Sequence, residues 1–82
     1  MLTLFPIKLY TTSNCHLCEQ AVELLTQAKL TKQLVLVEIV DDALLLAMYG
    51  TRIPVLQRTD TTSELDWPFS VDTIIKFMNA ST

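Results

Sequence analysis

The change of hydrophobic period along the first half of the chain is the feature that most constrains its fold. Residues 5–11 alternate apolar and mixed side chains, as a strand does, and residues 34–40 are almost continuously β-branched or leucine. Between them the apolar side chains follow the spacing of an amphipathic helix, at Leu17, Ala21, Leu24, Leu25 and Ala28. A continuous apolar run is typical of a strand buried on both faces, as in a parallel sheet. The pattern predicts a strand, helix, strand unit.

A second, shorter helix is predicted after this unit. Asp41 and Asp42 precede residues 43–49 and favour the start of a helix there. Gly50 is the only glycine of the chain and follows that segment directly. We expect it to take the left-handed conformation that ends many helices.

The remaining third of the chain predicts a hairpin and a last helix. Residues 53–57 are expected to form a strand with Pro54 at its beginning, and a polar turn leads into a short strand at 63–67. Ser70 is expected to cap the final helix. The apolar side chains of that helix are Val71, Ile74, Ile75 and Met78. The predicted order is βαβαββα, within a single domain over residues 1–82.

Composition excludes several classes of protein. The chain has 82 residues, half of them hydrophobic, with 6 basic and 9 acidic side chains and a formal charge of -3. Low-complexity and collagen-like chains differ strongly from this composition. The basic residues are scattered, so neither a nucleic acid nor an anionic membrane is expected as a partner. Residues 1–6 have no basic or long apolar stretch typical of a signal peptide, and no uncharged stretch approaches the length of a membrane span. A cytoplasmic protein is the expectation.

Cys15 and Cys18 are the two cysteines, and they lie at the predicted start of the first helix. Residues three apart share a helix face, so the sulfurs can form a bond. Unpaired backbone N–H groups at a helix N-terminus favour the thiolate of Cys15, the species that attacks disulfides. Cys18, beside the apolar stripe, should be less exposed. We therefore assign Cys15 as nucleophile and Cys18 as resolving cysteine, and both as catalytic.

Two other uses of the pair stay open. The cysteines could ligate a metal or an iron-sulfur cluster in a dimer, through Cys15 and an external thiol. The fold could also carry the pair without turnover, as a non-catalytic adaptor or interaction module. A closed zinc site needs four ligands, and the chain offers two cysteines and one histidine, so no metal site is assigned.

The residues around the cysteines have less specific roles. His16 and Leu17 lie between the two sulfurs and are assigned to substrate contact, with His16 facing solvent. Thr12, Ser13 and Asn14 are the candidate N-caps of the helix. Thr11, Thr12 and Ser13 could instead donate hydrogen bonds to the sulfur, although a polar run before a helix more often only caps it.

Three segments together carry a resemblance that spans essentially the whole chain. They are Leu-Tyr-Thr-Thr-Ser-Asn-Cys-His-Leu-Cys at 9–18, Tyr-Gly-Thr-Arg-Ile-Pro-Val-Leu at 49–56 and Leu-Asp-Trp-Pro-Phe at 65–69. In these segments the chain resembles the small glutaredoxin-like proteins, which have a thioredoxin fold. The resemblance implies an α/β fold with a four-stranded mixed sheet of order 2-1-3-4, flanked by helices. It also implies thiol-disulfide oxidoreductase activity and a role in cell redox homeostasis.

The same resemblance implies a substrate platform. Pro54 is expected to be cis and to face the cysteines, while the backbone of Ile53 pairs with a bound peptide or thiol. Substrates are expected to be protein disulfides or low-molecular-weight thiols, with the thioredoxin or glutathione system as electron donor and no cofactor required.

Glutathione is the ligand for which the resemblance implies particular binding residues. Its γ-glutamyl end would lie near Ser70, Val71 and Asp72, with Arg52 as a partner for its carboxylate. The chain departs from better-known glutaredoxins in having Thr12 where a lysine is frequent, and no Gly-Gly pair before the last helix. These departures weigh against glutathione binding.

Overall fold

The computed structural model describes residues 5–80 and contains a four-stranded sheet of order β2-β1-β3-β4. The strands are β1 (Ile7–Thr11), β2 (Leu34–Glu38), β3 (Val55–Arg58) and β4 (Glu64–Asp66). The pair β1 and β2 is parallel, whereas β3 runs antiparallel to both β1 and β4. The predicted mixed sheet and hairpin are thus confirmed. Residues 1–4, in the segment where no signal peptide was expected, lie outside the described residues.

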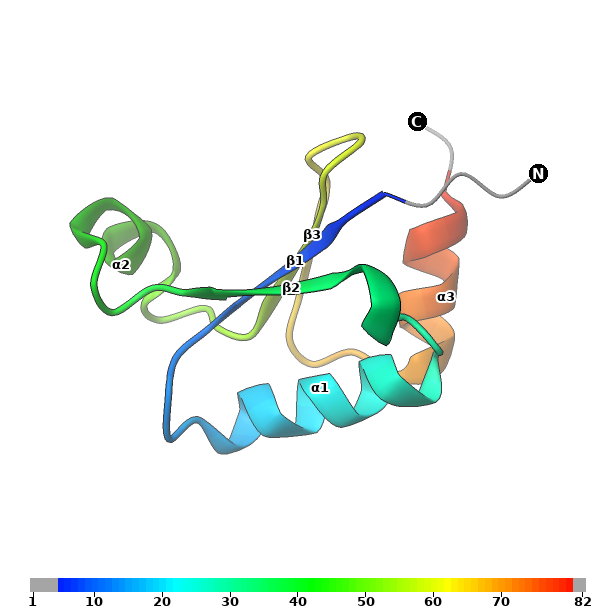
Figure 1. Cartoon of the computed structure of the whole chain (residues 1–82), viewed down its shortest axis with the longest axis horizontal. Coiled ribbons are helices and arrows are strands. Elements are labelled where there is room, and N and C mark those ends of the chain that lie inside the picture. The colour runs from blue at the N-terminus through cyan, green and yellow to red at the C-terminus, as the bar shows by residue number, and fades with distance from the viewer. Residues whose placement is uncertain (1–4, 81–82) are drawn as a thin grey trace.

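Within residues 5–80, two α-helices connect strands and a third follows the last strand, in the predicted order. They are α1 (His16–Gln27), α2 (Ala43–Tyr49) and α3 (Val71–Asn79), with a short 3-10 helix at Thr31–Gln33 before β2. In Figure 1, β1 descends to the start of α1, and α1 then runs back toward α3. Helix α2 lies at the end of the molecule opposite to α3. The predicted α/β fold is confirmed.

The alternation of side chains along β1 divides the core between the two faces of the sheet. Ile7 and Leu9 are fully buried on one face, where α1 and α3 cover them with Leu25 and Ile74. Tyr10 points to the other face and stacks on Tyr49 of α2, with ring centroids 4.0 Å apart. Helices therefore flank both faces, and α1, which carries the cysteines, belongs to the larger cluster.

The expectation that residues 34–40 form a strand buried on both faces is wrong. β2 is the edge strand of the sheet, and Val35 and Leu36, which point to opposite faces, are 46% and 55% exposed. The physical reason is coverage. A strand becomes buried on both faces only where helices cover it, and the short helix α2 packs its Tyr49 on Tyr10, one strand further in.

The two ends of α2 agree with one sequence expectation and differ from another. Asp42 caps α2 as expected, since its Oδ1 accepts hydrogen bonds from the backbone N–H groups of Leu44 and Leu45. Gly50 is right-handed, with φ -52°, so the expected left-handed conformation is wrong. A Cβ atom there would lie 2.5 Å from the carbonyl oxygen of Leu46, so close approach of the backbone explains the glycine.

The helix faces are mostly as expected, with one exposed residue on each stripe. On α3, Ile74 is fully buried whereas Ile75 is 45% exposed, and on α1, Leu17 is exposed although Ala21 and Leu25 are buried. The expected N-cap of α3 is confirmed, because the Ser70 hydroxyl accepts from the Thr73 backbone N–H in a capping box.

Candidate redox site

Cys15 occupies the N-cap position of α1, one residue before the helix begins. Its backbone is extended, and its Sγ accepts a hydrogen bond from the backbone N–H of Cys18 at 3.2 Å. A cap by Thr12, Ser13 or Asn14 is therefore wrong: the sulfur itself takes the place of a capping oxygen, and satisfies one of the free N–H groups of the first turn.

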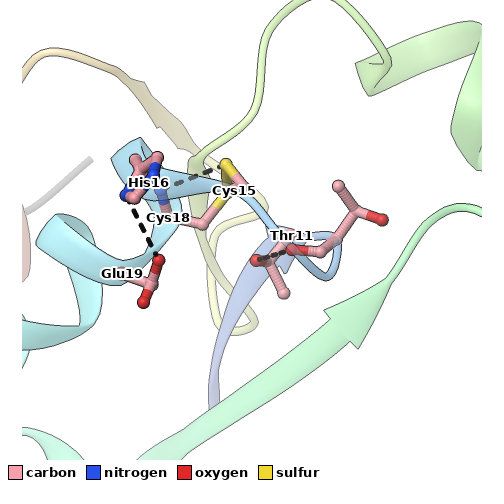
Figure 2. The surroundings of a disulfide bond; sticks show 6 residues. Thr11, Cys15, His16, Cys18 and Glu19 are labelled. Atoms are coloured by element: carbon pink, nitrogen blue, oxygen red, sulfur yellow. Dashed lines mark hydrogen bonds and ion pairs between the residues drawn. A yellow bond between two sulfur atoms is a disulfide. The ribbon is translucent and has the colours of Figure 1, made fainter.

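Cys18 lies in the first turn of α1 and forms a disulfide with Cys15, with the two Cα atoms 5.2 Å apart (Figure 2). Its residue is only 3% exposed, because it packs beside the buried face of α1, whereas Cys15 is half-buried. The pair thus has one half-buried and one enclosed cysteine residue. This asymmetry is what a nucleophilic and a resolving cysteine require.

The two residues between the cysteines project from the surface. His16 is almost fully exposed, and its Nδ1 lies 3.6 Å from Oε2 of Glu19 on the same side of α1 (Figure 2). Leu17 is also exposed. Their assignment to substrate contact stays a prediction.

The loop before Cys15 hydrogen-bonds to the end of β2 and not to the sulfurs. Within residues 5–80 no side-chain hydroxyl donates a hydrogen bond to either sulfur, and Thr11 donates to the carbonyl oxygen of Thr12. Glu38 pairs with Thr11 in the sheet, and the Thr12 hydroxyl and the Val40 N–H beside its carboxylate hold the pKa of Glu38 below its usual value. Sequence reasoning missed this carboxylate, because only strand pairing brings it to the cysteine loop.

Pro54 precedes β3, and the Ile53–Pro54 peptide bond is cis, as the resemblance implied. The N–H of Ile53 already donates to the Tyr49 carbonyl. Pairing of the Ile53 backbone with a bound peptide or thiol stays a prediction. That Pro54 faces the cysteines stays a prediction. A second cis bond, Trp67–Pro68, was not expected from the sequence.

Arg52 is engaged inside the protein. Its Nη2 donates to Glu64 at 2.7 Å and to Asp66 at 2.8 Å, and these carboxylates raise the pKa of Arg52. The Tyr49 hydroxyl also donates to Glu64, at 2.6 Å, which together with Arg52 holds the pKa of Glu64 below its usual value despite partial burial. Burial, and then the bond to Glu64, raise the pKa of Tyr49. A ligand carboxylate would therefore compete with Glu64 and Asp66 for this guanidinium.

Two of the three expected glutathione residues at the start of α3 are likewise engaged. Ser70 is used in the capping box, and Asp72 forms an exposed ion pair with Lys76 at 3.2 Å. Among the described residues, no group of three or more histidine, cysteine or carboxylate side chains is arranged to hold a metal ion. In the same part of the chain, no helix is long and apolar enough to cross a bilayer.

Comparisons with known proteins agree with this fold and this pair. The model of the family described as Glutaredoxin-like domain (DUF836) matches residues 6–79, so the chain belongs to that family of small thioredoxin-fold proteins. No curated protein matches the chain.

Solved structures of bacterial proteins share the fold. The X-ray structure of target protein XcR50 from X. campestris is 42% identical, with a TM-score of 0.85, over 93% of this chain and 99% of that one. The solution structure of the same target protein is 41% identical, with a TM-score of 0.83, over 95% of this chain and 97% of that one. Protein Ne2328 from Nitrosomonas europaea, at 24% identity and a TM-score of 0.74 over 94% of each chain, shows the fold alone. Family and cysteine pair together support a redox-type role.

Proposed function

We propose that this protein is a thiol-disulfide oxidoreductase in which Cys15 is the nucleophile and Cys18 the resolving cysteine. The observation that carries the proposal is the asymmetric pair at the start of α1. The half-buried Cys15 sulfur accepts the N–H of Cys18, and the Cys18 residue is 3% exposed.

The reaction starts from the reduced pair. The Cys15 thiolate attacks one sulfur of a substrate disulfide, forming a mixed disulfide and releasing the other substrate sulfur as a thiolate. Cys18 loses its proton to solvent, and its thiolate attacks Cys15 Sγ, which releases the second substrate sulfur. Two electrons pass from the cysteine pair to the substrate, which becomes a dithiol. An external thiol reductant then returns two electrons to the Cys15–Cys18 disulfide.

The position of Cys15 favours the attacking species. The Cys18 N–H that reaches the sulfur in the disulfide would also donate to a thiolate there, and the N-terminal end of α1 adds a partial positive charge. Since a charge-assisted hydrogen bond is stronger than a neutral one, the thiolate gains more from this contact than the disulfide does.

We place protein disulfides or low-molecular-weight thiols as substrates, and the thioredoxin or glutathione system as electron donor. Ile53 and Pro54 remain the proposed platform for the substrate backbone. The pairing of Arg52 with Glu64 and Asp66 disfavours a site specific for glutathione.

A redox titration tests the proposal. The purified protein is equilibrated in thiol-disulfide buffers of defined potential, alkylated, and its free thiols counted by mass spectrometry. We expect a reversible two-electron transition between about -300 and -150 mV. A pair that never cycles in this range would overturn the proposal and favour an adaptor.

The two single-cysteine variants are matched controls for each other. Cys15→Ser should abolish turnover of a disulfide substrate, whereas Cys18→Ser should accumulate the mixed disulfide between Cys15 and the substrate. Trapping through Cys18 in Cys15→Ser would reverse the assigned roles. A brown purified protein whose colour is lost in Cys15→Ser would indicate an iron-sulfur cluster instead.

A further inference from the structure

A groove on the β2 side of the disulfide is separate from the platform expected at Pro54. It is lined by residues 11–15, by Cys18, Glu19 and Val22 of α1, and by Leu36 of β2, and has a volume of about 300 Å3. We call it the β2-side groove. Both cysteines belong to its lining, so a molecule bound there lies next to the proposed reacting pair.

The wall formed by β2 lacks the protection that the other sheet edge has. β4 is three residues long, and its two carboxylates are paired with Arg52. β2 is five residues long, and its first four are Leu-Val-Leu-Val. Exposed apolar edge strands readily pair with another extended chain, and natural proteins shield them with charge or shortness. The outer side of β2 is unpaired within the described residues.

Leu36 connects this edge to the groove. It pairs with the fully buried Leu9 in the sheet, which places its side chain on the α1 face, yet it is 55% exposed. Val22 and Cys18 line the same groove. An apolar side chain inserted against Leu36 would therefore bury apolar surface within reach of the disulfide.

The charges around the groove select the sign of its occupant. Glu19 is the charged residue of the lining, and Glu38 ends β2 beside Thr12. Among the described residues, no lysine or arginine lines the groove. Because both flanking charges are negative, a cationic segment is attracted and an anionic thiol such as glutathione is repelled.

We propose that the β2-side groove binds an extended, basic segment of a protein substrate, which adds to the edge of β2, inserts an apolar side chain against Leu36 and presents a disulfide-bonded cysteine to the Cys15 thiolate, the other sulfur of that disulfide leaving as a thiolate. The inference rests on the proposed oxidoreductase function and names its substrate class. The main-chain pairing provides affinity, and the apolar contact and charge provide specificity.

Two peptide disulfides and one small disulfide test the proposal. The basic peptide has a single cysteine among valines and lysines, and the acidic peptide has glutamates in place of the lysines. Each peptide is used as a disulfide formed through its cysteine. Bis(2-hydroxyethyl) disulfide serves as the small substrate. We expect kcat/KM to be about three- to tenfold higher for the basic than for the acidic peptide, falling with added salt. Glu19→Lys should reduce this preference by roughly two- to fivefold.

The apolar contact is tested with a matched pair of leucine variants. Leu36→Ser should lower the ratio of the rates for the basic peptide and the small disulfide by about three- to tenfold. Leu44→Ser, at a 69% exposed leucine on α2, should leave that ratio unchanged. If all three disulfides react equally and Leu36→Ser matches Leu44→Ser, the groove proposal is wrong while the oxidoreductase stands. If none reacts, the proposed function itself fails.

A trapped complex gives the direct reading. In the mixed disulfide of Cys18→Ser with the basic peptide, the NMR signals of the backbone amides of Leu34–Glu38 should shift relative to the same variant without peptide. Shifts confined to residues 52–54 and the start of α3 would overturn the proposal and favour the Pro54 platform. Self-association that Leu36→Ser abolishes, with β2 unchanged by the peptide, would overturn it in favour of a second copy of the chain.

Discussion

Individual side chains in this protein act through contacts that their residue type alone does not define. Arg58 is the clearest case, because it is charged and yet only 6% exposed. Its Nη1 donates to the carbonyl oxygens of Phe77 and Ala80 at the end of α3, and its Nε and Nη2 bind Asp60. One guanidinium thereby holds the hairpin to the last helix.

Replacing Arg58 should therefore destabilise the fold strongly. Arg58→Ala leaves Asp60 and two carbonyl groups of α3 without their donor, an arrangement that costs more than losing a surface pair. We expect a fall in the thermal midpoint of more than about 5 °C, measured by circular dichroism.

Lys76→Ala is the control for this prediction. Lys76 lies on the same helix and forms an exposed ion pair with Asp72, in which both side chains are more than 70% exposed. Exposed pairs contribute little, so the midpoint should hardly change. Equal midpoints for both variants would show that the Arg58 contacts do not support the fold.

At the scale of single elements, two adjacent isoleucines on α3 differ in burial although they are the same residue type. Ile74 is fully buried against the sheet, whereas Ile75 is 45% exposed. Ile74→Ala should cost roughly 2 to 5 kcal/mol of unfolding free energy, and Ile75→Ala less than about 1 kcal/mol, because a cavity forms only at the buried position. Urea denaturation measures both. Similar losses would mean that α3 is rotated relative to the described face.

Gly50 tests the end of α2. In an ordinary right-handed position, replacing glycine by alanine stabilises a protein by about 0.4 to 1 kcal/mol. Here the added Cβ meets the Leu46 carbonyl oxygen at 2.5 Å, and a backbone atom does not move aside easily. We therefore expect Gly50→Ala to lower the free energy of unfolding, by about 1 kcal/mol in urea denaturation. A gain would show that the contact relaxes freely.

At the scale of the whole molecule, carboxylates with lowered pKa values make the fold sensitive to acid. Hydrogen bonds hold the pKa of Glu38, Asp60 and Glu64 below their usual values of 4.5, 3.8 and 4.5 in the folded state. The unfolded chain therefore binds more protons at acidic pH. The stabilisation is fully present above these usual values and is lost as the pH falls through them toward the lower folded values.

Urea midpoints at pH values from 7 to 3 measure this loss. Glu64→Gln should be less stable than the natural chain at pH 7, because Arg52 and Tyr49 lose a charged acceptor. Its midpoint should also fall less between pH 7 and pH 3. Glu23→Gln, on the exposed side of α1, should keep the full acid dependence. Parallel curves for Glu64→Gln and the natural chain would contradict the role given to Glu64.

The order of the elements and the cysteine site were predictable from the sequence, because both depend on local patterns. Periodicity distinguishes strands from helices, Asp42 and Ser70 cap the helices that follow them, and a cysteine pair three residues apart at a helix start meets free N–H groups wherever that helix packs. The sheet order and the cis Ile53–Pro54 bond came from the family resemblance and were confirmed.

Burial and long-range pairing were decided by the tertiary structure. An apolar strand is enclosed only if its neighbours cover it, and β2 lies at an edge with Leu36 open to the groove. Arg52 pairs with Glu64, and Arg58 donates to the carbonyl of Phe77. These partners are distant in the sequence, so residue type did not reveal them. Local sequence determined which elements form and where the sulfurs meet, whereas packing determined which surfaces remain accessible, because accessibility depends on all neighbouring elements at once.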